Sequence, residues 1–184
     1  MPWMPRLLFL VALGLFAGRA DAQVEPSLKV GAKVAGFKVQ AVTGENAGKV
    51  VDFVAERKDK PTVFAFVRAK DFDRPMSRFL KALDEELSNG IAGVTDPATV
   101  AVWLTDDPKS SVAYLPRAQQ SLNLNRSTLA VFEGSSDGPE GWALDLRARL
   151  SVVVVRDGKV AGIFGYISLN ETDVAAVVEA IKAK

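Results

Sequence analysis

The residues from Pro61 to Leu87 read PTVFAFVRAKDFDRPMSRFLKALDEEL, and this stretch decides the fold. Thr62 to Val67 is apolar without alternation and rich in β-branched and aromatic residues, which predicts a strand buried on both faces of a sheet. A charged turn, Asp71-Phe72-Asp73-Arg74, follows, and either aspartate can cap the helix that we expect after it. The apolar residues of that helix recur at helical spacing and form one stripe: Met76, Phe79, Leu80, Leu83 and Leu87.

Upstream of this stretch the pattern indicates short strands. Lys33 to Val42 alternates apolar and polar residues, as a strand with one buried face does, and Val50 to Val54 is a candidate for a second strand. Glu56 to Lys60 is a run of charges that we interpret as a solvated loop.

Downstream, the sequence alternates between strands and helices. Thr99 to Leu104 and Thr128 to Phe132 are apolar runs that predict buried strands, with a helix from Pro108 to about Ser121 between them. Asp107 precedes Pro108 as a cap and first-turn pair. Strand–helix–strand units of this kind favour parallel pairing with right-handed crossovers.

The last third of the chain predicts a hairpin and a terminal helix. Leu150 to Val155 and Val160 to Phe164 flank Asp157-Gly158, which is a strong hairpin signal. Asn170 or Thr172 then caps a helix, whose apolar face comprises Val174, Val177, Val178 and Ile181. Glu133 to Gly141 is a Gly/Ser/Pro loop. Trp142 to Arg149 has neither the apolar spacing of a helix nor that of a strand.

The N-terminus carries the pattern of an export signal. A short basic segment ends at Arg6, an apolar run extends from Leu7 to Gly18, and small residues at Ala20 and Ala22 place the cleavage between Ala22 and Gln23. The apolar run is shorter than the roughly 20 residues of a membrane-spanning helix. We therefore expect a signal peptide at residues 1–22, one domain at residues 23–184, no membrane span after cleavage, and a periplasmic or secreted protein.

Composition excludes several kinds of chemistry. The chain of 184 residues contains no cysteine and no histidine, so its own side chains provide neither a thiolate nor an imidazole base. The net charge is +1 and the charges are interspersed, without the basic patch of a nucleic-acid-binding protein.

The order of elements resembles that of the thioredoxin-like superfamily, in the branch of the peroxiredoxins and thiol-disulfide oxidoreductases. Val30-Gly31 with Ala35-Gly36-Phe37 is similar to the N-terminal segment of that branch, and Val152 to Val160 (VVVVRDGKV) is similar to its penultimate hairpin. The resemblance implies an α/β thioredoxin-like fold, with a central mixed sheet, helices on both faces, a β-hairpin and a C-terminal helix.

The active site of this superfamily does not carry over to the chain. The resemblance places the cysteine-x-x-cysteine motif on Asp71-Phe72-Asp73-Arg74, so that Asp71 and Arg74 stand where the two thiols would be. It places the cis-proline of the superfamily on Leu150, followed by Ser151, and we expect a trans bond before a leucine. Because attack on a disulfide or peroxide needs a thiolate, we expect no thiol redox activity, no catalytic residue of that kind and no cofactor.

We therefore predict a binding or scaffolding module with a protein partner. Its candidate recognition surface comprises Asp71, Phe72, Asp73, Arg74, Leu150 and Ser151, because such folds bind ligands at the carboxyl ends of parallel strands. One alternative is an enzyme, either of the thioredoxin- or peroxiredoxin-like class by fold or a carboxylate- or metal-dependent hydrolase, in which Asp71 and Asp73 bind a cation or act as acid and base. Two carboxylates alone make a weak metal site, so capping is the favoured role. Another alternative is a subunit that acts beside a cysteine-bearing partner.

Overall fold

The strand after Pro61 is an internal strand of a seven-stranded sheet in the computed structural model, which describes residues 28–183. The strand order is β2-β1-β5-β4-β3-β6-β7, with β3, β4 and β5 parallel and all other pairs antiparallel. The predicted signal peptide and its cleavage site lie outside the described residues. The elements are β1 (Val39–Ala41), β2 (Val50–Val51), α1 (Phe53–Arg57), β3 (Thr62–Arg68), η1 (Ala69–Asp71), α2 (Arg74–Asn89), β4 (Ala98–Leu104), α3 (Pro108–Leu122), β5 (Ser127–Phe132), β6 (Leu150–Arg156), β7 (Lys159–Tyr166), η2 (Glu171–Asp173) and α4 (Val174–Lys182).

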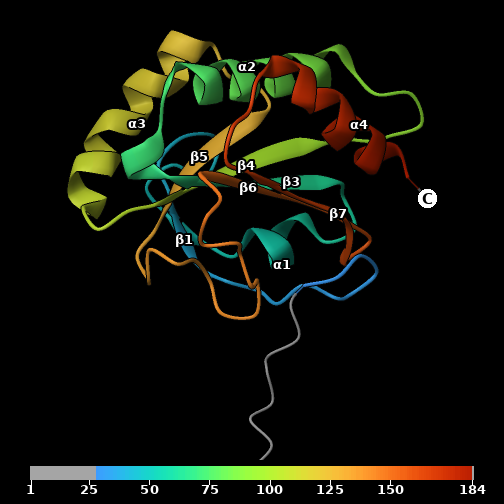
Figure 1. Ribbon diagram of the computed structural model, residues 1–184, viewed down its shortest axis with the longest axis horizontal. Coiled ribbons are helices and arrows are strands. Elements are labelled where there is room, and N and C mark those ends of the chain that lie inside the picture. The colour runs from blue at the N-terminus through green and yellow to red at the C-terminus, as the bar shows by residue number, and fades with distance from the viewer. Residues whose placement is uncertain (1–27, 184) are drawn as a thin grey trace, which may run out of the picture.

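Helices cover both faces of the sheet, as the resemblance implies, but they do so unequally (Figure 1). The three longer helices α2, α3 and α4 share one face, and the predicted apolar stripe of α2 is fully buried there. The other face is covered by the short helix α1, by Phe37 and by the loop that carries Trp142. The chain therefore has a mixed sheet, a closing hairpin and a C-terminal helix, as predicted.

Three predicted caps are confirmed. Asp73 accepts a hydrogen bond from the backbone N–H of Met76 at 3.1 Å, and Asp107 accepts one from Ser110 at 3.1 Å. Asn170 completes a capping box on η2, just before α4. No cis peptide bond occurs in residues 28–183, so the bond before Leu150 is trans, as predicted.

The prediction for residues 50–60 was wrong in part. The strand β2 ends at Val51, and a helix follows where we expected a strand and a loop. The Asp52 carboxylate accepts hydrogen bonds from the backbone N–H groups of Val54 and Ala55, at 3.0 and 3.2 Å. This N-cap outweighs the strand preference of the neighbouring valines, because it satisfies donors that a helix start leaves free.

The segment from Trp142 to Arg149, which matched no period, fills the weakly covered face of the sheet. Trp142 is 1% exposed and its indole Nε1 donates a hydrogen bond to the Ala35 carbonyl at 3.0 Å. Its ring lies 4.9 Å from Phe37 and 5.1 Å from both Phe64 and Phe66, centroid to centroid. One aromatic side chain on a loop thus closes the core where no long helix lies.

A second long-range contact joins α2 to the loop before β5. The buried carboxylate of Asp84 accepts hydrogen bonds from the backbone N–H groups of Asn125 and Arg126, both at 2.8 Å, and from the Ser127 hydroxyl at 2.6 Å. These donors compensate the cost of burying a charge, since charge-assisted hydrogen bonds are the strong ones.

We predict that Trp142→Ala lowers the free energy of unfolding by about 3–5 kcal/mol, since it leaves a large cavity and an unpaired carbonyl. Urea denaturation followed by circular dichroism measures this. Leu146→Ala, in the same loop but 60% exposed, serves as the control and should change stability by less than about 0.5 kcal/mol. Equal effects of the two variants would contradict the role given to Trp142.

We also predict that Asp84→Asn destabilises the protein by about 1.5–3 kcal/mol, because an amide replaces a charged acceptor that faces only donors. The matched control is Glu86→Gln, on an exposed position of the same helix. A free energy of unfolding for Asp84→Asn within about 0.5 kcal/mol of the control would show that the buried carboxylate contributes little.

Candidate functional site

The predicted recognition surface lies at the carboxyl ends of the parallel strands β3 and β4. The helix η1 follows β3 without a gap, and Asp73 then begins α2. The strand β6 pairs with β3 so that Leu150 lies opposite Val67, and its first residues therefore approach the turn before α2. The fold thus brings residues 71–74 and the start of β6 together.

An ion pair joins these two segments. The Arg149 guanidinium donates from Nη2 to the Asp73 carboxylate at 2.6 Å and to the Asp71 backbone carbonyl, also at 2.6 Å. Sequence reasoning missed Arg149, which precedes β6 by one residue. Asp73 is therefore both the cap of α2 and the partner of an arginine that lies far away in the sequence.

The ion pair sets the protonation of Asp73. Partial burial raises the pKa of this carboxyl, but the hydrogen bonds from Arg149 and from the Met76 N–H, with the positive charge of Arg149, bring the pKa below its ordinary value of 3.8. Asp73 is ionised at neutral pH and its charge is compensated within the fold.

Phe72 and Tyr114 form the aromatic part of this surface. The Phe72 ring is half-buried and lies 5.2 Å from the ring of Trp103, which is buried in the core. On its other side it lies 6.3 Å from the ring of Tyr114, which is 46% exposed. A hollow of about 300 Å³ lies beside the pair, lined also by Ser77, Arg117 and Leu122. Tyr114 was not predicted, because α3 gave no clear apolar stripe around it.

Two predicted residues of the recognition surface do not reach it. Leu150 is 0% exposed and Ser151 is 7% exposed, because β6 lies between β3 and β7 with both faces covered. Their side chains cannot contact a partner in this conformation, and we correct the surface accordingly. Arg149 takes their place as the contribution of this segment.

A second hollow, of about 390 Å³, lies on the other side of η1 and is lined by Arg68, Lys70, Asp106 and Ser111 among others. Arg68 donates to the carbonyls of Ala148 and Ser136, at 2.9 and 3.0 Å, and so holds the loop between β5 and β6. In residues 28–183 no group of three or more acidic side chains is placed to hold a metal ion.

The ion pair predicts a pH dependence. Because the pKa of Asp73 is lower in the folded state, its ionised form adds stability above the unfolded value near 3.8, and this stability is lost as the pH falls through the lower folded value. We expect Asp73→Asn, which keeps a capping side chain, to be less stable than the wild type at pH 6, and the difference to shrink at pH 3. Urea denaturation at both pH values measures it.

The control for this experiment is Asp71→Asn, because Arg149 contacts the backbone carbonyl of Asp71 and not its carboxylate. It should show little change at either pH. A wild-type advantage over Asp73→Asn that is as large at pH 3 as at pH 6 would contradict the assignment.

No family model and no curated protein sequence matches the chain. Solved structures do. A peroxidoxin, BcpB, from Mycobacterium tuberculosis has a TM-score of 0.63 at 16% identity, covering 84% of this chain and 97% of that one. A peroxiredoxin-like protein from Aquifex aeolicus has a TM-score of 0.55 at 19% identity, covering 85% and 89%.

BsSco, a member of the Sco family of cytochrome c oxidase assembly proteins in which a disulfide switch was identified, has a TM-score of 0.57 at 16% identity, covering 85% of this chain and 98% of that one. At these identities the likeness shows the fold and not an activity. The chain has the thioredoxin-like fold, without a cysteine anywhere in its sequence.

Proposed function

We propose that this protein is an exported, redox-inactive binding module that recognises a protein partner at the carboxyl ends of β3 and β4. Its recognition surface comprises Phe72, Arg74, Tyr114 and Arg117, held in place by the Asp73–Arg149 ion pair. The N-terminal sequence supports export to the periplasm or the exterior through its basic segment, apolar run and small residues before Gln23.

The observation that carries the proposal is an aromatic pair, a half-buried Phe72 and an exposed Tyr114, beside a hollow. Phe72 is supported from beneath by Trp103, and Tyr114 is exposed beside it. Aromatic residues and arginines are enriched where proteins bind one another, since they supply large contact areas. A partner chain that places one apolar side chain into the hollow of about 300 Å³ would cover both rings.

The rigidity of the surface supports binding as well. Residues 71–73 are fixed by the start of α2 and by Arg149, which contacts both Asp71 and Asp73. A preorganised surface loses little conformational entropy when it binds. The same ion pair argues against the hydrolase alternative, because Arg149 already binds the Asp73 carboxylate that a metal ion or a substrate would need.

The fold itself is compatible with a role in assembly. BsSco, which shares the fold, belongs to a family of cytochrome c oxidase assembly proteins. That protein has a disulfide switch, and this chain cannot form one, because it contains no cysteine. We therefore propose binding alone, without a redox step.

The test is a pull-down from the native exported fraction with residues 23–184 as bait. We expect a partner that the wild-type bait retains and that Phe72→Ser with Tyr114→Ser loses by about tenfold or more, as for truncated hot spots. These substitutions leave the Asp73 cap and the Arg149 ion pair in place, and circular dichroism checks the fold.

Val30→Ser is the matched control. Val30 is 68% exposed, and Gly31 next to it bonds to Val160 at the opposite end of the sheet. It should retain the partner. Retention by both baits would place binding elsewhere, and no retained protein with any bait would count against a binding module.

A further inference from the structure

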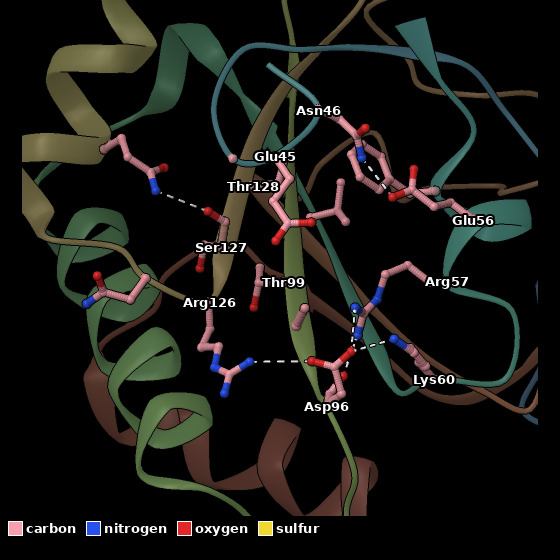
Figure 2. Close-up of a pocket in the computed structure, with 16 residues that line it drawn as sticks. Glu45, Asn46, Glu56, Arg57, Lys60, Asp96, Thr99, Arg126, Ser127 and Thr128 are labelled. Carbon is pink, nitrogen blue, oxygen red and sulfur yellow. Dashed lines mark hydrogen bonds and ion pairs between the residues drawn. The ribbon is translucent and has the colours of Figure 1, made fainter. Parts of the chain in front are cut away.

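A further cavity of the described residues lies at the opposite end of the parallel strands, away from the proposed recognition surface. It has a volume of about 310 Å³ and is enclosed by the first residues of β4 and β5, by α1, and by the turn that contains Glu45 and Asn46 (Figure 2). This volume is in the range of small-molecule sites. No motif in the sequence predicts this cavity, because its walls come from five separate segments.

A buried hydroxyl lies at the floor of the cavity without a partner. Thr99 is 1% exposed, and its Oγ1 makes no hydrogen bond with any described residue. Buried polar groups are nearly always hydrogen-bonded, because an unpaired one keeps its full desolvation cost. In Figure 2 this side chain lies between Glu45 and the Arg126–Asp96 ion pair. A polar atom of a ligand would supply the hydrogen bond that the Thr99 hydroxyl lacks.

One end of the cavity carries an excess of positive charge. Three cations converge on the single carboxylate of Asp96: Lys60 at 2.7 Å, and Arg57 and Arg126 at 3.4 Å each. Arg57 is held rigidly, since it also donates to the Thr62 hydroxyl and the Pro61 carbonyl, at 3.1 and 3.3 Å. Three charges that share one carboxylate can accept a second anionic group.

Asp96 itself has a φ of +50°, in the left-handed region that costs a non-glycine residue energy. Its carboxylate is held among the three cations by the ion pairs that they make with it. Strain of this kind is found preferentially where a site must keep a fixed geometry.

The opposite side of the cavity is acidic. Glu56 accepts a hydrogen bond from the Asn46 amide at 2.7 Å, and Glu45 points toward the cavity from the same side (Figure 2). The two carboxylates lie across from the Arg126–Asp96 pair in that view. The cavity therefore has a basic end and an acidic end, with the Thr99 hydroxyl between them.

From this arrangement we infer that the cavity binds a small zwitterion with a carboxylate and an amine, of the size of an amino acid. The carboxylate of the ligand binds to Lys60 and Arg126 and accepts a hydrogen bond from the Thr99 hydroxyl. The amine of the ligand binds between Glu45 and Glu56. A phosphate would carry more negative charge than the cations compensate and would be repelled by the two glutamates. A simple amine would leave the basic end of the cavity without an anion. This inference does not depend on the proposed function, because the two sites lie at opposite ends of the sheet.

Calorimetric titration tests the inference with a ladder of probes: glycine, β-alanine, γ-aminobutyrate and δ-aminovalerate, in which the two charges are progressively farther apart. Valerate and pentylamine are the singly charged controls. We expect at least one member of the ladder to bind about tenfold more tightly than either control, since each charged contact adds to the affinity.

Substitutions at Glu45 and Thr99 test the acidic end of the site and the hydroxyl between its two ends. Glu45→Gln, at an exposed position, should lower the affinity for the zwitterion to that for valerate. Glu133→Gln, at an exposed position elsewhere, should leave both affinities unchanged. Thr99→Val should weaken every carboxylate probe by about threefold to tenfold, and Thr99→Ser should restore it. In the absence of a probe, Thr99→Val should not lower the free energy of unfolding, because the hydroxyl has no partner to lose.

Three outcomes would overturn the inference. The first is that no probe binds to the wild type. The second is that valerate binds as tightly as the best amino acid, which would indicate a site for anions alone. The third is that Thr99→Val leaves the affinity unchanged, which would separate the orphan hydroxyl from the ligand.

Discussion

The whole structure depends on the burial of β3 on both faces. This strand is hydrogen-bonded to β4 on one side and to β6 on the other, and residues 62–67 are buried without alternation. Such a strand is stable only when each face of its sheet is covered. On one face the helices α2, α3 and α4 provide that cover. On the other face it is provided by Phe37, by Trp142 and by the short helix α1, which Asp52 caps. The loop before β6 is consequently part of the core.

The sequence predicted the elements whose signals are local. The apolar run of β3, the stripe and cap of α2, and the Asp157-Gly158 turn of the hairpin each depend on residues that are neighbours in the chain. The start of α1 was missed because the Asp52 cap competes with the strand preference of the valines around it. The roles of Trp142 and Asp84 could not be predicted, because their partners are as far away as Ala35 and Ser127.

The candidate site shows the same division. The turn from Asp71 to Arg74 was placed correctly, at a strand end, because the strand and the helix on either side of it were recognised. Leu150 and Ser151 were placed at the right end of the sheet but with the wrong exposure. Their burial follows from β7, which pairs with β6 and makes it an internal strand. The residue just before the strand, Arg149, is the one whose side chain reaches the turn.

The turn from Asp71 to Arg74 contains no cysteine, and its shape follows from other groups. The helix α2 still needs a cap, and a carboxylate at that position needs a cation, so Asp73 and Arg149 fix each other and leave Phe72 against Trp103. At the other end of the same strands no such mutual compensation is complete: three cations share Asp96, and the Thr99 hydroxyl has no partner among residues 28–183. Polar groups that satisfy one another stabilise a fold, whereas those left unsatisfied in a cavity gain most from a ligand. We therefore propose different occupants for the two ends of the sheet, a polypeptide over the aromatic surface and a small polar molecule within the polar cavity.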